Sequence, residues 1–217
     1  MPTRDFRPTC ARPALALALA TALAATLPAA GARADAQPGK PAPEFQLRDT
    51  SGKDVSLASL KGRIVVLEWT NHECPYTVKH YVGGNMQGLQ KETTAMGIVW
   101  LTVASSAKGQ QGHVSAAEAD KLTADRKAAP SHVLLDHDGK LGRLYGARTT
   151  PHMYIVDKDG KLAYAGAIDD KPTASERDIK GARNYVREAV GALAEGKPVA
   201  TPATRAYGCS VKYAPAS

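Results

Sequence analysis

The sequence predicts an α/β protein in which helices flank both faces of a central mixed β-sheet, with a β-hairpin at its N-terminal end. Short apolar runs rich in β-branched residues, typical of buried strands, alternate along the chain with segments of helical pattern. Turn sequences that suit antiparallel hairpins stand at both ends of this alternation. The sheet should therefore contain both parallel and antiparallel strands.

The first 34 residues have the order of a secretory signal peptide. Three arginines precede an apolar Ala/Leu run at 14–27, and Ala32-Arg33-Ala34 places small residues at the −3 and −1 positions of a cleavage site. The run is short for a bilayer span, so we expect cleavage and no stable membrane anchor. We therefore expect a protein exported to the periplasm, whose mature chain begins at Asp35.

Composition and charge exclude some classes of partner. The chain is 43% hydrophobic and 23% charged, which suits a globular domain with a real core. Loss of residues 1–34 removes four arginines and one aspartate, which lowers the formal net charge from +7 to +4. So mild a charge, without a basic stripe, argues against a nucleic-acid partner.

The first elements should carry the chain from a hairpin to a long helix. Residues 44–47 and 55–57 flank a turn that contains Gly52, which predicts the N-terminal hairpin. The β-branched run at 64–68 predicts a buried central strand. Pro75 suits the first position of a helix that extends to about residue 95, and Gly83-Gly84-Asn85 should kink or break it.

The middle of the domain repeats this alternation. Residues 98–103 predict the next buried strand, and the capping box that begins at Ser115 predicts a helix to about residue 126. A short strand at 133–135 and a short helix at 141–145 should follow.

A second hairpin and a helix should complete the domain. Strands are predicted at 152–156 and 162–166, and Ser175 should cap a final helix that extends to about residue 195. We interpret residues 35–197 as one domain and residues 198–217 as a C-terminal tail.

Several stretches resemble one family. A strand, a loop, a cysteine at a helix start and a Thr-Pro pair before a hairpin resemble the thioredoxin superfamily, and the segments Pro41–Phe45 and Leu60–Gly62 resemble its redoxin branch, the alkyl hydroperoxide reductase/thiol-specific antioxidant proteins. Three further stretches resemble a peroxiredoxin-like subgroup: Asn71–Tyr76, Thr150–Tyr154 and Gly208–Tyr213. The resemblance covers residues 38–213 and implies a thioredoxin-like fold with thiol-dependent oxidoreductase activity.

Cys74 is the candidate nucleophile. At a helix N-terminus, unpaired N–H groups and the helix dipole favour the thiolate and lower the thiol pKa. His72 and Lys79 are close in sequence and would add to this effect. The alternative is an inert buried cysteine, or one half of a permanent disulfide.

Cys209 is the second cysteine of the mature chain. It could resolve an oxidised Cys74, because a sulfenic acid condenses with a thiol to a disulfide that an external thiol reopens. It could equally form a structural disulfide with Cys74, worth roughly 5 kcal/mol by the chain-entropy model. An oxidising compartment suits both interpretations.

The resemblance also implies the remaining site residues. Pro151 would be a cis-proline that faces Cys74, and the Thr150–Pro151 segment would orient the substrate. The candidate substrate-binding residues are Thr70, His72, Pro75, Tyr76 and Arg148.

This chain departs from the family pattern at two positions. Thr77 stands where thioredoxins have a second cysteine, so local dithiol exchange is not available. Thr70 lies four residues before Cys74, whereas peroxiredoxins have a threonine three residues before the reactive cysteine.

We therefore predict an exported oxidoreductase that uses Cys74 to attack a peroxide or a disulfide and needs an external thiol reductant, for which a membrane-linked carrier is our hypothesis. No cofactor and no metal are expected. Two other functions remain open: a module that binds protein or copper, with copper held by His72, Cys74 and His152, and an interaction domain stapled by a Cys74–Cys209 disulfide. The segment Asp169-Asp170-Lys171 is expected to be a solvated turn.

Overall fold

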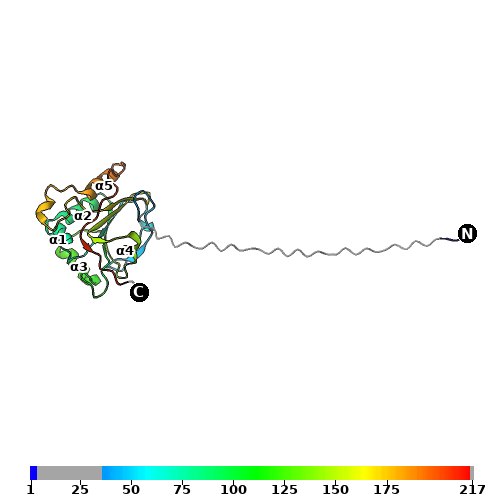
Figure 1. Ribbon diagram of the computed structural model, residues 1–217, viewed down its shortest axis with the longest axis horizontal. Helices are drawn as coiled ribbons and strands as arrows, with labels where there is room; N and C mark the ends of the chain where they lie inside the picture. Colours follow the sequence, from blue (N-terminus) through cyan, green and yellow to red (C-terminus); the bar gives the residue numbers. More distant parts are fainter. Residues whose placement is uncertain (4–35, 216–217) are drawn as a thin grey trace. The chain divides into compact units, whose positions relative to one another are not determined.

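The computed structural model describes residues 1–3 and 36–215 (Figure 1). The expected signal peptide lies almost wholly outside the described residues. Among those described, no helix has the length and apolar character needed to cross a membrane.

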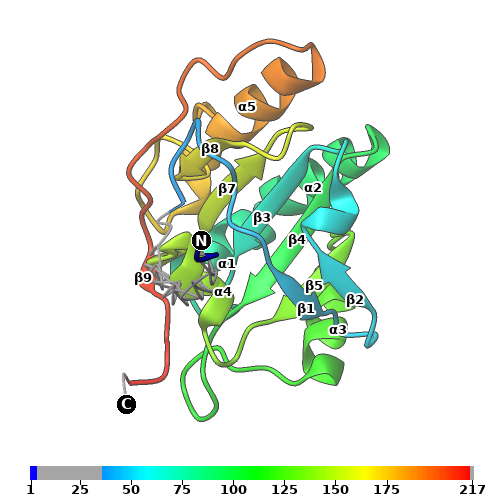
Figure 2. The same ribbon diagram turned by 90° about the vertical axis from the view of Figure 1, so that its right-hand side faces the viewer.

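A five-stranded mixed sheet forms the centre of the fold (Figure 2). In spatial order its strands are β5 (His132–Leu135), β4 (Val99–Ala104), β3 (Val65–Trp69), β7 (His152–Val156) and β8 (Leu162–Gly166). The first three are parallel, whereas β7 and β8 are antiparallel to their neighbours. Every residue of β3 and β4 is buried, which explains why both strands are mainly apolar, with Glu68 and Thr102 as their polar members.

Alternate residues of the central strands pack on opposite faces of the sheet. Val66 of β3 packs with helices α1 (Pro75–Val82), α2 (Asn85–Ala95) and α5 (Tyr185–Ala194). The next residue, Leu67, points to the opposite face of the sheet, which a hairpin and a short helix cover. That cover comprises β1 (Gln46–Arg48), β2 (Asp54–Ser56), the 3-10 turn Ala58–Leu60 and α4 (Lys140–Tyr145). The predicted mixed sheet with helices on both faces and an N-terminal hairpin is confirmed.

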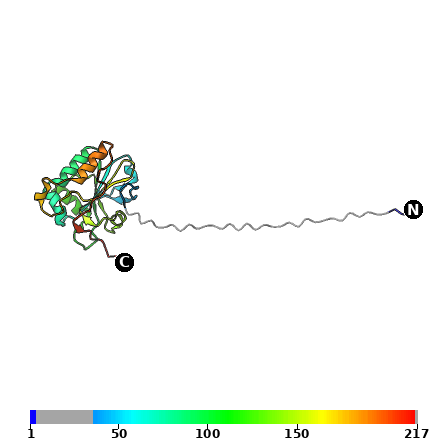
Figure 3. The same cartoon turned by 45° about the horizontal axis from the view of Figure 1, so that its top comes forward.

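The long helix predicted from Pro75 is broken, as the glycines indicated. Helix α1 ends before Gly83, and Gly84 adopts a left-handed conformation with φ of 71° before α2 begins. Helices α2 and α5 lie side by side (Figure 3), joined by an ion pair between Glu92 and Arg187 at 3.0 Å.

Helix α3 (Ala116–Asp125) begins at the predicted capping box. The Ser115 side chain accepts a hydrogen bond from the Glu118 N–H, while the Glu118 carboxylate accepts from the Ser115 N–H. The helix connects β4 to β5 and packs on Ala104 and Val133.

The predicted start of the last helix at Ser175 is wrong. Residues Glu176–Ile179 form only a 3-10 turn, and Gly181, with φ of 85°, ends it. Helix α5 begins nine residues later than expected, where the Asn184 side chain accepts a hydrogen bond from the Arg187 N–H at 2.9 Å.

The tail is packed on the domain. It first lies beside β8, where Ala165 and Ala203 form a β-bridge. It then forms β9 (Cys209–Ser210), the red arrow in Figure 2. Strand β9 pairs antiparallel with β6 (Thr149–Thr150), the two residues that precede Pro151.

Candidate active site

Cys74 stands at the junction of β3 and α1. The Asn71 side chain accepts a hydrogen bond from the Glu73 N–H at 2.9 Å, and the Asn71 carbonyl accepts from the Cys74 N–H at 3.1 Å. This turn places Cys74 at the N-cap of α1, with Pro75 as the first helical residue. The Cys74 side chain is completely buried.

Thr150 and Cys209 close the site from the other side. The Cys74 thiol donates to the Thr150 carbonyl, with an Sγ–O distance of 3.0 Å. Thr150 is paired directly with Cys209 across the β6–β9 ladder, and both cysteines are free thiols. The fold therefore brings together two thiols that are 135 positions apart in sequence.

The two thiols have opposite pKa shifts. Burial alone raises the pKa of Cys74, but the Cys209 thiol, the Thr150 side chain and the Thr77 N–H can donate to the thiolate and outweigh burial, so the net pKa lies below the ordinary value. Burial and the neighbouring Cys74 raise the pKa of Cys209 to about 11. Cys74 is therefore the thiol that ionises first, with Cys209 as its hydrogen-bond donor.

Two threonine hydroxyl groups near Cys74 are buried without a hydrogen-bond partner among the described residues. They belong to Thr77, three residues along α1, and to Thr150. Buried polar groups are normally paired, so each can donate to an additional acceptor. An oxygen atom attached to the Cys74 sulfur would be such an acceptor.

Gly208 allows the tail to approach the Thr150–Pro151 segment. It has φ of 135°, and a Cβ atom there would overlap the Thr150 carbonyl oxygen. Any side chain at this position would push β9, and with it Cys209, away from Cys74. The Thr150–Pro151 peptide bond itself is cis.

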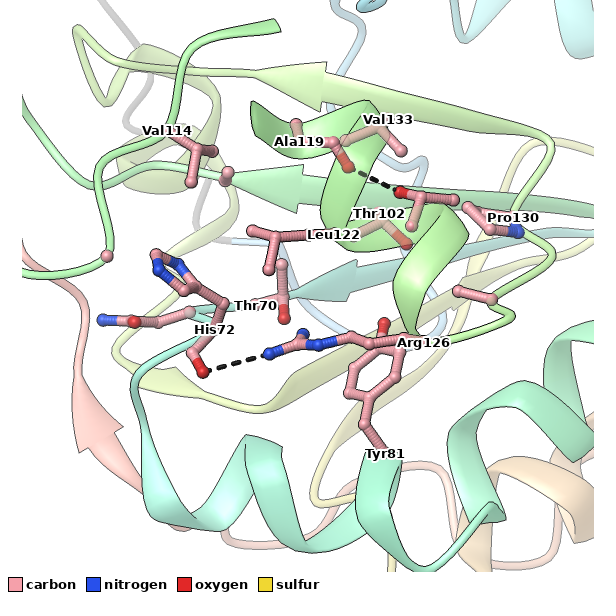
Figure 4. Close-up of a pocket in the computed structure, with 15 residues that line it drawn as sticks. Thr70, His72, Tyr81, Thr102, Val114, Ala119, Leu122, Arg126, Pro130 and Val133 are labelled. Carbon is pink, nitrogen blue, oxygen red and sulfur yellow. Dashed lines mark hydrogen bonds between the residues drawn. The ribbon is translucent and has the colours of Figure 1, made fainter. Parts of the chain in front are cut away.

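Thr70 and His72 lie in a different cavity. Figure 4 shows both lining a mainly apolar pocket under α3, where the His72 carbonyl accepts a hydrogen bond from Arg126 at 3.0 Å. Burial is the main cause that lowers the pKa of His72. The pKa of Cys74 is set by Cys209, Thr150 and Thr77 rather than by His72 or Lys79, which the sequence had suggested.

Tyr76 and Arg148 contact the tail. The Tyr76 ring meets the Tyr207 ring edge-on, with centroids 5.9 Å apart. The Arg148 side chain is exposed, and its carbonyl accepts a hydrogen bond from the Val211 N–H at 3.0 Å. Both residues therefore contact the segment that carries Cys209.

His152 is engaged away from Cys74. Its Nδ1 accepts from the Arg148 N–H and lies 3.3 Å from the Tyr154 hydroxyl, and burial lowers its pKa to about 4. Within residues 1–3 and 36–215, no group of three or more His, Cys, Asp or Glu side chains is placed to hold a metal ion. The suggested copper set of His72, Cys74 and His152 is thus not assembled among the described residues.

Three features of the site escaped the sequence analysis: the close approach at Gly208, the hydroxyl group of Thr77, and Tyr207. Only Gly208 carried a usable signal, since a glycine directly before a cysteine suggests a tight backbone contact. The expected solvated turn at Asp169 is wrong, because Asp169 is buried next to Tyr207.

Solved structures with the same fold include a conserved protein of Geobacillus kaustophilus, with 26% identity over 84% of this chain and 95% of that one and a TM-score of 0.71. A hypothetical protein from Sinorhizobium meliloti is 21% identical over 83% of this chain and 96% of that one, with a TM-score of 0.69. A secreted Mycobacterium tuberculosis disulfide oxidoreductase is 18% identical over 69% of this chain and 96% of that one, with a TM-score of 0.50.

No curated protein matches the chain significantly. The family model described as AhpC/TSA matches residues 38–165, more than half of the chain, and this segment contains Cys74 and Pro151 but not Cys209. With its thioredoxin-like fold, the chain belongs to the AhpC/TSA family.

Proposed function

We propose that the protein is an exported thiol-dependent oxidoreductase in which Cys74 is the nucleophile and Cys209 the resolving thiol. One observation carries the proposal: a buried thiol of lowered pKa at the start of α1 faces a second thiol across the Thr150 carbonyl. Low thiol pKa at a helix N-terminus is typical of reactive cysteines.

Peroxide is the first candidate substrate. The Cys74 thiolate attacks one peroxide oxygen, the O–O bond breaks, and the second oxygen leaves as water or an alcohol after it takes up a proton. The sulfur becomes a sulfenic acid, whose oxygen the Thr150 hydroxyl can reach as a donor. The Cys209 thiol then attacks the Cys74 sulfur, a disulfide forms, and water leaves.

A disulfide is the second candidate substrate, and it leads to the same product. Cys74 attacks one sulfur and releases the other as a thiol, and Cys209 then displaces the second half of the substrate. A small molecule suits the site better than a folded protein, because Cys74 is fully buried beneath the tail.

Two equivalents of an external thiol would complete the cycle. In the Cys74–Cys209 disulfide the sulfur of Cys209 is the accessible one, since its residue is half-buried whereas Cys74 is fully buried. A reductant thiolate would attack Cys209 and release Cys74, which is also the better leaving group because its pKa is lower. For an exported protein, we propose a membrane-linked thiol carrier as the donor.

The test uses the mature protein from Asp35, fully reduced. It is mixed in parallel with one equivalent of hydrogen peroxide and with one equivalent of glutathione disulfide. Free thiol is followed in time, and the products are mapped by peptide mass. Fast loss with only one of the two identifies the substrate class, and a Cys74–Cys209 disulfide as product supports the roles assigned here.

Matched serine variants complete the test. Cys209→Ser should keep the fast first step and stop at an oxidised or mixed-disulfide Cys74, whereas Cys74→Ser should lose the fast step. If neither oxidant reacts faster than with free cysteine, and both variants lower the melting temperature of the oxidised protein equally, the disulfide is a structural staple and the proposal is wrong.

A further inference from the structure

A buried polar cluster lies behind α1, outside the thiol site. Lys79 and His80 of α1 face Asp169 from the segment after β8, and Tyr207 of the tail lies among them. The side chains of Lys79 and His80 are fully buried, and that of Asp169 is 1% exposed. The steps proposed for Cys74 use none of these four residues.

The hydrogen bonds of the cluster have a consistent direction. Asn184, the N-cap of α5, donates to the Asn85 side-chain oxygen at 3.4 Å, so the Asn85 amide nitrogen faces His80 Nδ1, at 2.9 Å. His80 Nδ1 is therefore an acceptor, and its Nε2–H points to the Tyr207 hydroxyl at 3.3 Å. The Tyr207 hydroxyl in turn donates to the Asp169 carboxylate. We call this chain, from Asn184 through Asn85, His80 and Tyr207 to Asp169, the relay.

The charges of the cluster agree with this direction. Burial, together with the neighbouring Lys79, lowers the pKa of His80 to about 3, so its ring is neutral and has one N–H to donate. The Lys79 ammonium lies 3.8 Å from the Asp169 carboxylate and donates to the Lys171 carbonyl at 2.7 Å. Asp169 is thus a buried carboxylate that accepts a hydrogen bond from the Tyr207 hydroxyl. A hydrogen bond to a charged group is stronger than one between two neutral groups.

Tyr207, the member of the relay that belongs to the tail, lies two residues before Cys209. The one residue between them, Gly208, already lies against the Thr150 carbonyl, so the backbone from Tyr207 to Cys209 has little freedom to move separately. We propose that Tyr207 is a positioning residue: through the relay it keeps the reduced tail docked and holds Cys209 against Cys74.

This inference rests on the proposed function only in taking Cys209 to be the partner of Cys74. Its consequence is a high effective concentration of Cys209, because a tail that detaches must be brought back before the disulfide closes. The relay therefore sets how stable the Cys74–Cys209 disulfide is relative to an external disulfide.

The test is the equilibrium of the mature protein with glutathione buffers, read as the fraction of Cys74–Cys209 disulfide by alkylation and mass. Tyr207→Phe keeps the ring and removes the hydroxyl. We expect it to lower the equilibrium constant for disulfide formation about tenfold or more. Tyr145→Phe is the matched control, since it removes a buried hydroxyl that donates at 2.8 Å to the carbonyl of Pro43, a residue of the N-terminal part of the domain and not of the tail. It should change the constant less than twofold.

Hydrogen exchange of the reduced protein gives a second readout. Tyr207→Phe should accelerate exchange in the segment 203–213 and leave the central strands unchanged. Asn85→Ala, which removes the donor to His80 without altering the tail, should produce the same effects on a smaller scale and serves if Tyr207→Phe does not fold.

Equal equilibrium constants for the wild type, Tyr207→Phe and Tyr145→Phe, with unchanged exchange in the tail, would overturn the inference. The equilibrium is measurable whether or not the protein reacts with peroxide. Failure of the relay is therefore distinguishable from failure of the proposed function.

Discussion

Cys74 and Cys209 face each other, but two very different parts of the molecule hold them. Cys74 follows a fully buried central strand and begins a helix with four buried residues, of which Tyr81 packs in the hydrophobic core. Cys209 belongs to a two-residue strand near the C-terminal end of the chain, held by its pairing with β6. On either side of it, Tyr207 and Tyr213 attach the tail through single hydroxyl groups.

Because of this difference, the reactivity of Cys74 and the closure of the Cys74–Cys209 disulfide should depend on different contacts. Core packing fixes the position and environment of Cys74, and few single changes outside the core should move it. A short set of contacts fixes the position of Cys209, so small changes in the tail should alter how the pair closes while the reactivity of Cys74 persists. The segment matched by the AhpC/TSA model ends at residue 165, so this second part lies beyond it.

The largest expected effect comes from the nucleophile itself. Cys74→Ser should slow the first oxidation step by a factor of about 100 or more, since a hydroxyl group is not a comparable nucleophile at neutral pH. Stopped-flow measurement of oxidant consumption by the reduced protein checks this. The comparison would fail if Cys209→Ser, rather than Cys74→Ser, removed the fast phase.

Gly208→Ala should impair disulfide closure without changing the reactivity of Cys74. The new methyl group would meet the Thr150 carbonyl, so β9 must shift, and we expect a stability loss of about 1–3 kcal/mol, measured by urea unfolding. Disulfide closure should slow by about tenfold or more, while the first step at Cys74 keeps its rate.

Gly191→Ala is the matched control for that variant. Gly191 lies inside α5, and a methyl group added there would have no neighbouring atom within 4 Å among the described residues outside its own helix turn. The change should raise the stability by up to about 1 kcal/mol and leave closure unchanged. Equal closure rates in both glycine variants would contradict the role of the close approach.

Acid should destabilise the folded protein through His80, which α1 places against Tyr207 of the tail. Its pKa is about 3 in the folded protein, and the ordinary value is 6.5. Below pH 6.5 the unfolded chain binds a proton that the folded protein cannot, so stability falls between pH 6.5 and about 3. At about pH 4.5 the loss from His80 should be about 2–3 kcal/mol.

Urea unfolding at about pH 7 and about pH 4.5 measures this loss in the wild type and in His80→Gln. The difference between the two pH values should be smaller in the variant by about 2–3 kcal/mol. An identical pH dependence in both proteins would show that His80 is not held neutral by burial.

The smallest expected effect is a change in the titration of each thiol when the other is removed. In Cys74→Ala, the pH midpoint for alkylation of Cys209 should fall from about 11 toward 9, because it no longer lies beside the Cys74 sulfur. In Cys209→Ala, the midpoint for Cys74 should rise, because a hydrogen-bond donor to its thiolate is lost. Unchanged midpoints in both variants would mean that the thiols do not interact.

The sequence predicted those parts of the fold that local patterns determine. The runs that form β3 and β4 are mainly apolar because both faces of these strands are covered, and Gly83-Gly84 marked the break after α1. The start of α5 was missed because Ser175 and Asn184 both fit a helix cap, and only packing decides between them.

The site was predictable only in part, for a similar reason. The helix start is a local signal that pointed to Cys74, and the resemblance to the thioredoxin superfamily implied that Thr150 and Pro151 lie opposite it. The burial of Asp169 depends on Tyr207, 38 residues further along the chain. Such contacts leave no periodic pattern in the sequence, and neither does the docking of the tail.

The most direct test of the divided roles is to find which sulfur a reductant attacks. The oxidised mature protein is mixed with a limiting amount of glutathione, quenched in acid, and its mixed disulfides are mapped by peptide mass. We expect glutathione on Cys209 and a free thiol at Cys74. Glutathione found on Cys74, or a disulfide that forms no adduct in the folded protein, would contradict this expectation.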